Sequence, residues 1–155
     1  MSRVLLPTLA CTLVCVGIAL AGGDGKPDFS GNWTLNLDKS KFGKAEKPNG
    51  MTLKVTREGD VTHAVQTTNT PGGPVDSESN WVLDGKEHNT AAPTPGKLLT
   101  RWEGNTLYSE RKSNDGAFDE KIWLMMSSDG KTVTEKVVTK TIEGTNVSNL
   151  VWQRQ

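Results

Sequence analysis

Short runs of alternating apolar and polar residues, separated by turn residues, constrain the fold of this chain more than any other feature. The stretches 29–37, 51–57 and 61–68 all alternate in this way, and a tight turn at 58–60 joins the last two. Successive side chains of a β-strand point to opposite faces, so strict alternation predicts strands that bury one face.

The same pattern continues to the C-terminus at hairpin spacing. Further strands are expected at 79–83, 86–91, 97–102, 106–112, 117–126, 131–142 and 145–154. Asp-Gly pairs such as Asp115-Gly116 and Asp129-Gly130 separate several of them, and such pairs favour hairpin turns because glycine tolerates a positive φ. No helix of convincing length interrupts the series, so the sequence predicts an all-β, up-and-down antiparallel architecture.

Two segments break this rhythm. Asp38–Gly50 is too polar for a core element and has room for one helical turn, whereas Thr70–Asp76 is expected to be a flexible connection. The last strand, by contrast, carries apolar residues on both parities, which does not suit an exposed sheet edge. We therefore expect a barrel of about eight to ten strands whose last strand pairs with its first, a size that can hold one small ligand. A β-sandwich or open sheet is the alternative.

The N-terminus has the order of a secretory signal peptide. Arg3 precedes an apolar run, and small residues end it at Ala19-Leu20-Ala21. We expect cleavage near Ala21, a flexible lead-in over 22–28 and one domain over 29–155, with no stable membrane anchor after cleavage. The alternative is a retained anchor, because the run is close to the length that spans a bilayer.

The predicted mature chain is nearly neutral, with 17 basic and 18 acidic residues. A nucleic-acid partner or an anionic membrane surface selects for clustered positive charge, so neither is expected. Both cysteines, Cys11 and Cys15, lie in the predicted signal. The domain therefore has no disulfide, although its compartment would allow one.

The two ends of the predicted domain resemble those of a known group. Phe29-Ser30-Gly31-Asn32-Trp33 resembles the Gly-x-Trp opening of the lipocalins and fatty-acid-binding proteins, the calycins, and Trp152-Gln153-Arg154 resembles their closing strand. In that group a basic residue lies across the first tryptophan. The resemblance implies a calycin-like barrel with Gly31, Trp33 and Arg154 as its structural signature, and an arginine over an indole also gains cation–π energy.

The sequence departs from this group in two places. Asp38–Gly50 is too short for the two lid helices of fatty-acid-binding proteins. The positions that read a carboxylate in those proteins are Leu150 and Trp152 here, so a fatty-acid anion held in that manner is not expected. The run Asp38–Gly43 also resembles exported bacterial proteins, which implies a periplasmic or secreted protein and brings no activity with it.

The titratable residues form no catalytic or metal-binding motif. His63 is placed on the inner face, either as a ligand or haem contact or, as the pattern favours, as an ordinary barrel histidine; His88 is expected to be exposed. Two separated histidines do not predict a zinc site. Glu110, Glu120 and Glu135 are interpreted as a solvated outer face. We therefore expect no catalytic residue, no metal and no cofactor.

Five tryptophans fall on five different predicted strands. Trp33 and Trp152 are interpreted as core residues at the closed end, and Trp123 is expected to face outward. For Trp81 and Trp102 the core and the ligand-pocket interpretations stay equal. The candidate ligand-binding residues of the barrel interior are Leu53, Val55, His63, Val65, Trp81, Leu83, Trp102, Ile122, Leu124 and Val137.

Two functional hypotheses follow from this pattern. The first is an exported, lipocalin-like, non-enzymatic protein that binds a small hydrophobic or amphipathic molecule inside the barrel. The second is a filled barrel that acts as a protein-interaction module, for example an inhibitor, through its loops or outer face. An internal cavity of about 300 Å³ or more would favour the first. The sequence leaves the ligand and the oligomeric state open.

Overall fold

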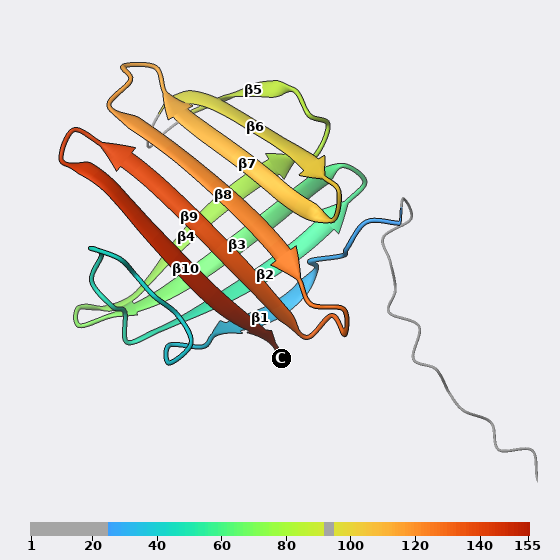
Figure 1. The fold of residues 1–155 in the computed structure, drawn as a ribbon, viewed down its shortest axis with the longest axis vertical. Coiled ribbons are helices and arrows are strands. Elements are labelled where there is room, and N and C mark those ends of the chain that lie inside the picture. Colours follow the sequence, from blue (N-terminus) through green and yellow to red (C-terminus); the bar gives the residue numbers. More distant parts are fainter. Residues whose placement is uncertain (1–24, 92–94) are drawn as a thin grey trace, which may run out of the picture.

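Ten antiparallel strands make up the fold in the computed structural model, which describes residues 25–91 and 95–155 (Figure 1). The strands are β1 (Gly31–Leu35), β2 (Gly50–Glu58), β3 (Val61–Thr70), β4 (Gly73–Val82), β5 (Glu87–Thr90), β6 (Gly96–Glu103), β7 (Thr106–Ser113), β8 (Phe118–Met126), β9 (Thr132–Thr141) and β10 (Gly144–Arg154). The described residues contain no helix, and so none that could cross a membrane. The predicted signal at 1–21 lies outside the described residues.

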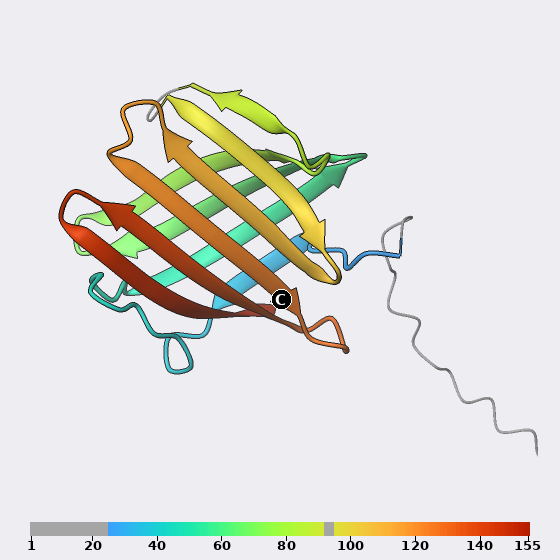
Figure 2. The same cartoon turned by 45° about the horizontal axis from the view of Figure 1, so that its top comes forward.

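The first and last strands pair with each other, as the sequence predicted. The sheet order is β4-β3-β2-β1-β10-β9-β8-β7-β6-β5, and Trp33 lies opposite Arg154 in the β1–β10 ladder. Strands β1 to β4 form one wall and β5 to β10 cross them as the other (Figures 1 and 2). The result is a nearly closed up-and-down barrel.

Pairing β1 with β10 does not remove both sheet edges; it moves them to β4 and β5. These two strands end the sheet order and share no hydrogen-bonded ladder, although β4 approaches β6. The barrel is therefore closed by a ladder at β1–β10 and has a gap between β4 and β5. The edges are protected differently, because β5 has only four residues and β4 is exposed and polar along most of its length.

Strand β4 also corrects the expectation of a flexible connection at 70–76. Strand β3 runs to Thr70, and β4 begins at Gly73 and pairs with β3 along its whole length. The sequence alone does not predict this strand over its full length, because it is an edge strand and most of its residues are exposed on both parities. Pro74 fits there since an edge strand can lose one donor without breaking an inner ladder.

The polar segment 38–50 contains turns and no helix. It is held to β10 by an isolated antiparallel bridge between Lys41 and Asn149, with N–O distances of 2.7 and 2.8 Å. The carbonyl of Phe42 also accepts hydrogen bonds from Asn146 and Ser148. These contacts fix the segment at one end of the barrel, where Phe42 packs against the core.

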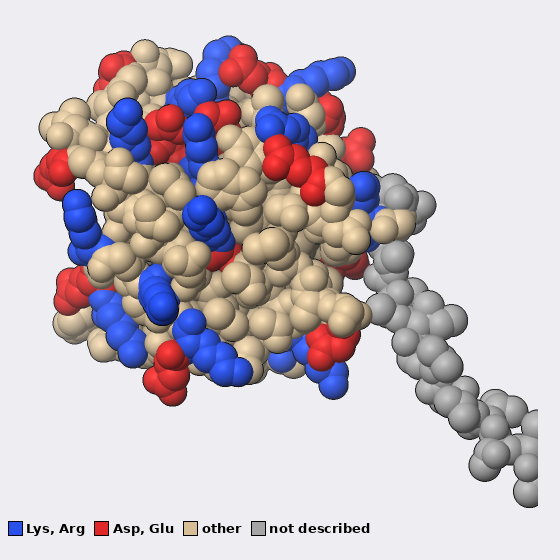
Figure 3. All heavy atoms as spheres, viewed as in Figure 1, with Lys and Arg blue, Asp and Glu red and all other residues tan. Residues whose placement is uncertain are grey.

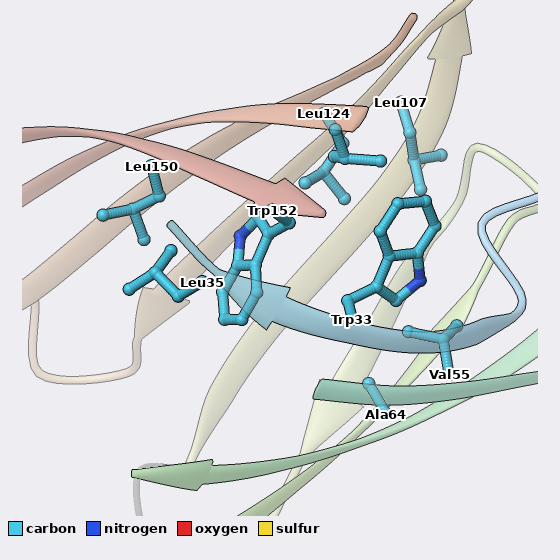
Figure 4. Packing of buried hydrophobic residues seen from close by; sticks show 9 residues of the cluster. Trp33, Leu35, Val55, Ala64, Leu107, Leu124, Leu150 and Trp152 are labelled. Carbon is cyan, nitrogen blue, oxygen red and sulfur yellow. The ribbon is translucent and has the colours of Figure 1, made fainter. Parts of the chain in front are cut away.

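The best-packed part of the interior lies at the β1–β10 seam. Trp33 and Trp152 are 2% and 1% exposed, which confirms their interpretation as core residues. Leu107 on β7 and Leu124 on β8 belong to the same cluster (Figure 4). Each buried tryptophan removes about 150–250 Å² from water, so this cluster anchors a barrel that has no disulfide.

Arg154 lies over the indole of Trp33, 4.3 Å from its centroid. Its guanidinium donates to the carbonyls of Ser30 at 2.6 Å, Gly130 at 2.8 Å and Asp28 at 3.1 Å. A Cβ on Gly31 would lie 2.7 Å from Nη1 of Arg154, and the φ of Gly31 is +130°. The contact between the two ends of the domain therefore requires glycine at position 31.

Candidate functional site

The interior of the barrel is hollow. A cavity of about 1160 Å³ lies between the two walls and receives side chains from every strand. Its apolar lining includes Phe29, Trp33, Met51, Leu53, Val55, Trp81, Leu83, Leu98, Trp102, Leu107, Ile122, Leu124, Val133, Val137, Leu150 and Trp152. The volume lies above the lower limit for a small-molecule site.

Eight of the ten residues predicted for the interior line this cavity: Leu53, Val55, Trp81, Leu83, Trp102, Ile122, Leu124 and Val137. His63 and Val65 do not. The two-residue turn between β2 and β3 places Val55 opposite Ala64, and directly opposed residues share a face. Since Val55 points inward, Ala64 does too, and the odd-numbered positions of β3 point outward.

The cavity reaches the gap between β4 and β5. Consecutive residues 76–81 of β4 line it, on both parities, together with 89–91 from the region of β5. A strand inside a continuous wall would contribute every second residue. Lining by both parities therefore shows that the space continues around the free edge of β4, which makes this gap the mouth of the cavity.

The charged part of the lining is predominantly acidic. Six carboxylates line the cavity: Asp28, Glu46, Asp76, Glu78, Glu120 and Glu135. Asp76 and Glu78 oppose outward residues of β3 and so lie at the free edge of β4. Two guanidinium groups, on Arg57 and Arg111, also line the cavity, and no lysine or histidine occurs among the described lining residues. The cavity thus combines apolar walls with an excess of negative charge.

Arg111 and Glu120 form a loose charged pair inside the barrel. They lie directly opposite each other in the β7–β8 ladder, and Nη2 of Arg111 is 3.9 Å from Oε1 of Glu120. Burial raises the pKa of Glu120, and the charge of Arg111 lowers it only in part. The Arg111 guanidinium also lies over the ring of Phe118, 4.8 Å from its centroid.

Glu135 lies deeper, beside the packed end of the barrel. Its Oε2 accepts a 2.6 Å hydrogen bond from Nε1 of Trp152. Burial, together with the charge of Glu120, raises the pKa of Glu135 to about 7 against the effect of that hydrogen bond. No described lysine, arginine or histidine lies within ion-pair distance of this carboxylate.

Two buried donors of the lining residues lack partners among the described residues. Nε1 of Trp102 and Nε of Arg111 make no hydrogen bond. Trp102 otherwise stacks on Phe29 with centroids 5.9 Å apart, and Lys26 approaches the same ring. A ligand with an acceptor atom could satisfy these donors, which buried polar groups otherwise rarely lack.

The expectation that Glu120 and Glu135 belong to a solvated outer face was therefore wrong. Glu135 shares its parity with Val133 and Val137, and Glu120 with Ile122 and Leu124, so both glutamates follow their apolar neighbours inward. That shared parity was the available signal. Glu110 has the opposite orientation, lies outside the cavity and pairs with Lys112 at 2.8 Å.

Trp123 does not line the cavity and lies on the outer side of the wall, as expected. It contacts Tyr108 with centroids 5.3 Å apart, and Lys136 lies over its ring at 5.4 Å. Basic and acidic side chains are interspersed over this face (Figure 3), so it carries no extended patch of one sign. His88 is paired with Asp84 at 2.9 Å.

The topology has well-defined counterparts among solved structures. A fatty-acid-binding protein of Echinococcus granulosus superposes with a TM-score of 0.59 at 15% identity, over 81% of this chain and 96% of that one. The fold is calycin-like. The fluorescent protein UnaG gives a TM-score of 0.57 at 15% identity, covering 82% and 97% of the two chains.

Two further neighbours extend the comparison. A zebrafish ileal bile-acid-binding protein in complex with cholic acid superposes with a TM-score of 0.54 at 15% identity, over 82% of this chain and 98% of that one. A secretory abundant heat-soluble protein from Ramazzottius varieornatus gives 0.58 at 12% identity, covering 82% and 95%. No protein-family model matches this sequence, and no curated protein sequence is similar enough to count as a relative.

These likenesses confirm the calycin-like architecture that the two ends of the domain indicated. At 12–15% identity they establish the fold alone. The residues that define the interior are this chain's own, and whether any of them contacts a ligand stays a prediction. Within the described residues no group of three His, Cys, Asp or Glu side chains could hold a metal ion.

Proposed function

We propose that this chain is an exported, non-enzymatic binding protein that takes a small amphipathic molecule into its barrel. The cavity of about 1160 Å³ is the observation that carries the proposal. It combines apolar walls, a small number of buried polar groups and a mouth, which are the usual features of a small-molecule site.

The fold neighbours support this proposal in general terms. Two of them are a fatty-acid-binding and a bile-acid-binding protein by name. The interior differs from an anion site built on the last strand, because Leu150 and Trp152 occupy that part of the lining. These neighbours therefore support the proposal that the barrel binds a small molecule, and they do not identify the ligand.

The two interior carboxylates do not favour an enzyme. In acid–base pairs the two environments push the pKa values apart. Here burial is the largest effect on both Glu120 and Glu135, and it raises the pKa of each. We therefore propose that these groups select a ligand and do not transform it.

A filled barrel, on which the interaction-module hypothesis rested, is not what the described residues form, because their interior is open. A protein contact through the outer face around Trp123 and Tyr108 stays a second prediction.

Export to the periplasm or the medium is proposed from the N-terminal pattern alone. Mass determination of the mature protein would test it through the expected cleavage near Ala21.

A paired substitution tests the binding function. Val137→Trp places a large side chain in the cavity, whereas Val138→Trp places the same side chain on the outer face of β9. Fluorescence titration with octyl-chain probes should show binding to the native chain and to Val138→Trp, and at least ten-fold weaker binding to Val137→Trp. Equal affinities for the two variants, or no binding by the native chain, would overturn the proposal.

A further inference from the structure

Glu135 occupies an otherwise apolar row of the barrel wall. The registers of four ladders place Leu150, Glu135, Leu124, Leu107 and Trp102 side by side on β10, β9, β8, β7 and β6. Four of these five side chains are apolar or aromatic, and all five line the cavity. A carboxylate in such a row loses hydration and needs another source of stabilisation.

The protein supplies only part of that stabilisation. Oε2 of Glu135 accepts the hydrogen bond from Trp152, while Oε1 has no partner among the described residues. Oε1 is also absent from the fully buried atoms that lack partners, so it is open to the cavity. Half of the carboxylate is thus fixed by the protein, and the other half is presented to whatever enters.

Of the two guanidinium groups that line the cavity, that of Arg111 is already engaged. Arg111 faces Glu120 across the β7–β8 ladder and lies over the ring of Phe118. Between its row and the row of Glu135 lies that of Ser109, Ile122 and Val137. Arg111 makes no ion pair with Glu135, and its charge is not among the causes of the raised pKa of Glu135.

We propose that the cavity selects an amphipathic molecule carrying a positively charged amine, with its ammonium group held by Oε1 of Glu135 and its apolar part against the surrounding leucines and tryptophans. This inference rests on the proposed binding function and specifies its ligand class. Even without Asp76 and Glu78, which lie on the outward face of β4, the lining has four carboxylates and two guanidinium groups. This excess acts in the same direction, because a low-dielectric cavity amplifies its field.

Three octyl probes that differ only in their head group test this inference: octylamine, octanol and octanoate. They are measured at pH 8, where Glu135, whose pKa burial raises to about 7, is mostly ionised. A charge-assisted hydrogen bond to a buried carboxylate is among the stronger contacts. We expect octylamine to bind at least ten-fold more tightly than octanol and octanoate, and ethylamine, which lacks the chain, to bind weakly.

The decisive variant is Glu135→Gln, which keeps the shape and the acceptor for Trp152 and removes the charge. This variant should bind octylamine at least ten-fold more weakly than the native chain does, and its affinity for octanol should stay within about two-fold of the native value. Glu110→Gln, on the outer face, is the matched control and should change neither. Near-ultraviolet circular dichroism of the tryptophans confirms that the variants keep the native packing.

The outcomes separate the two proposals. If no octyl probe binds, the binding function itself fails. If octanol or octanoate binds as well as octylamine, or if Glu135→Gln leaves octylamine unchanged, the barrel binds small molecules but the amine selectivity is wrong. Tighter binding of octanoate would instead assign the site to Arg111 and its unpartnered Nε.

Discussion

The barrel has two seams that differ in how they close. At β1–β10 the backbone ladder is continuous, two tryptophans are almost fully buried, and Arg154 ties three carbonyls together. At β4–β5 there is no shared ladder, the residues are polar and exposed, and the cavity reaches the surface.

The first seam stabilises the fold, and the second gives access to the cavity. Apolar burial and hydrogen bonding are concentrated where the two ends of the domain meet, so the opposite side of the barrel need not close. An unpaired edge is tolerated there because its side chains are polar, which discourages pairing with other chains. Changes at the first seam should therefore alter unfolding, and changes at the second should alter it little.

Removing a tryptophan from each region should give the largest contrast. Trp33→Ala should lower the free energy of unfolding by about 3–5 kcal/mol, because it empties the packed end. Trp81→Ala should cost clearly less, since Trp81 is only partly buried and borders the cavity near the gap. Urea unfolding measures both, and equal losses would break the distinction between the seams.

Glu135→Gln should remove a destabilising buried charge from the packed side of the barrel. The pKa of Glu135 is raised from 4.5 to about 7 in the folded protein, so folding favours its protonated form. Its ionisation therefore costs nothing below about pH 4.5, destabilises the fold increasingly as the pH rises from there to 7, and levels off above pH 7 at about 3 kcal/mol.

Measured between pH 5 and pH 9, the free energy of unfolding of the variant should increase relative to that of the native chain as the pH rises. Glu110→Gln, whose carboxylate pairs with Lys112 outside the cavity, should show no such gain. A pH-independent difference for Glu135→Gln would mean that the carboxylate is not desolvated.

Arg154→Lys tests the guanidinium at the closed seam. A lysine cannot reach three carbonyls at once, so we expect a loss of about 1–2 kcal/mol. Arg101→Lys is the matched control, because Arg101 also lies over an aromatic ring, that of Tyr108 at 4.4 Å, but has a half-exposed side chain that pairs with Glu103. Similar melting-temperature shifts for both variants would show that ring stacking, and not the carbonyl contacts, matters at Arg154.

Val75→Lys should have the smallest effect. Val75 lies on edge strand β4 and is 57% exposed, so its substitution should change the free energy of unfolding by no more than about 0.5 kcal/mol. An added charge on a free edge should also reduce self-association in light scattering. A loss above 1 kcal/mol would show that this seam is closed in solution.

The sequence predicts which face of a strand points inward where the strand's own alternation is clear. It does not do so where the register with a neighbouring strand decides the orientation. The inner faces of β8 and β10 follow from their own alternation, and Gly31, Trp33 and Arg154 indicated the seam. The orientation of His63 could not be read from β3 alone, because its partner β2 and the turn between them set the register. Strand β4 escaped prediction because its residues are exposed on both parities and carry no hydrophobic pattern.

The interior was predicted better for its apolar residues than for its charged ones. Glutamates on strands usually face water, and this expectation outweighed the parity that Glu135 shares with Val133 and Val137. The sequence also does not show that Trp152 reaches across to Glu135, since this contact joins side chains on two paired strands at a register the sequence leaves undetermined.

The contact between Arg154 and Ser30 spans 124 residues of chain. Every other ladder joins strands that follow one another in sequence, so these eight ladders can form locally before the ends meet. Closing a segment of this length costs conformational entropy before its contacts form, so we expect the one non-local ladder to form more slowly than the local ones. We expect the seam that gives the folded barrel most of its stability to be the last to form. Until that step is complete, β1 and β10 are unpaired edges in addition to β4 and β5.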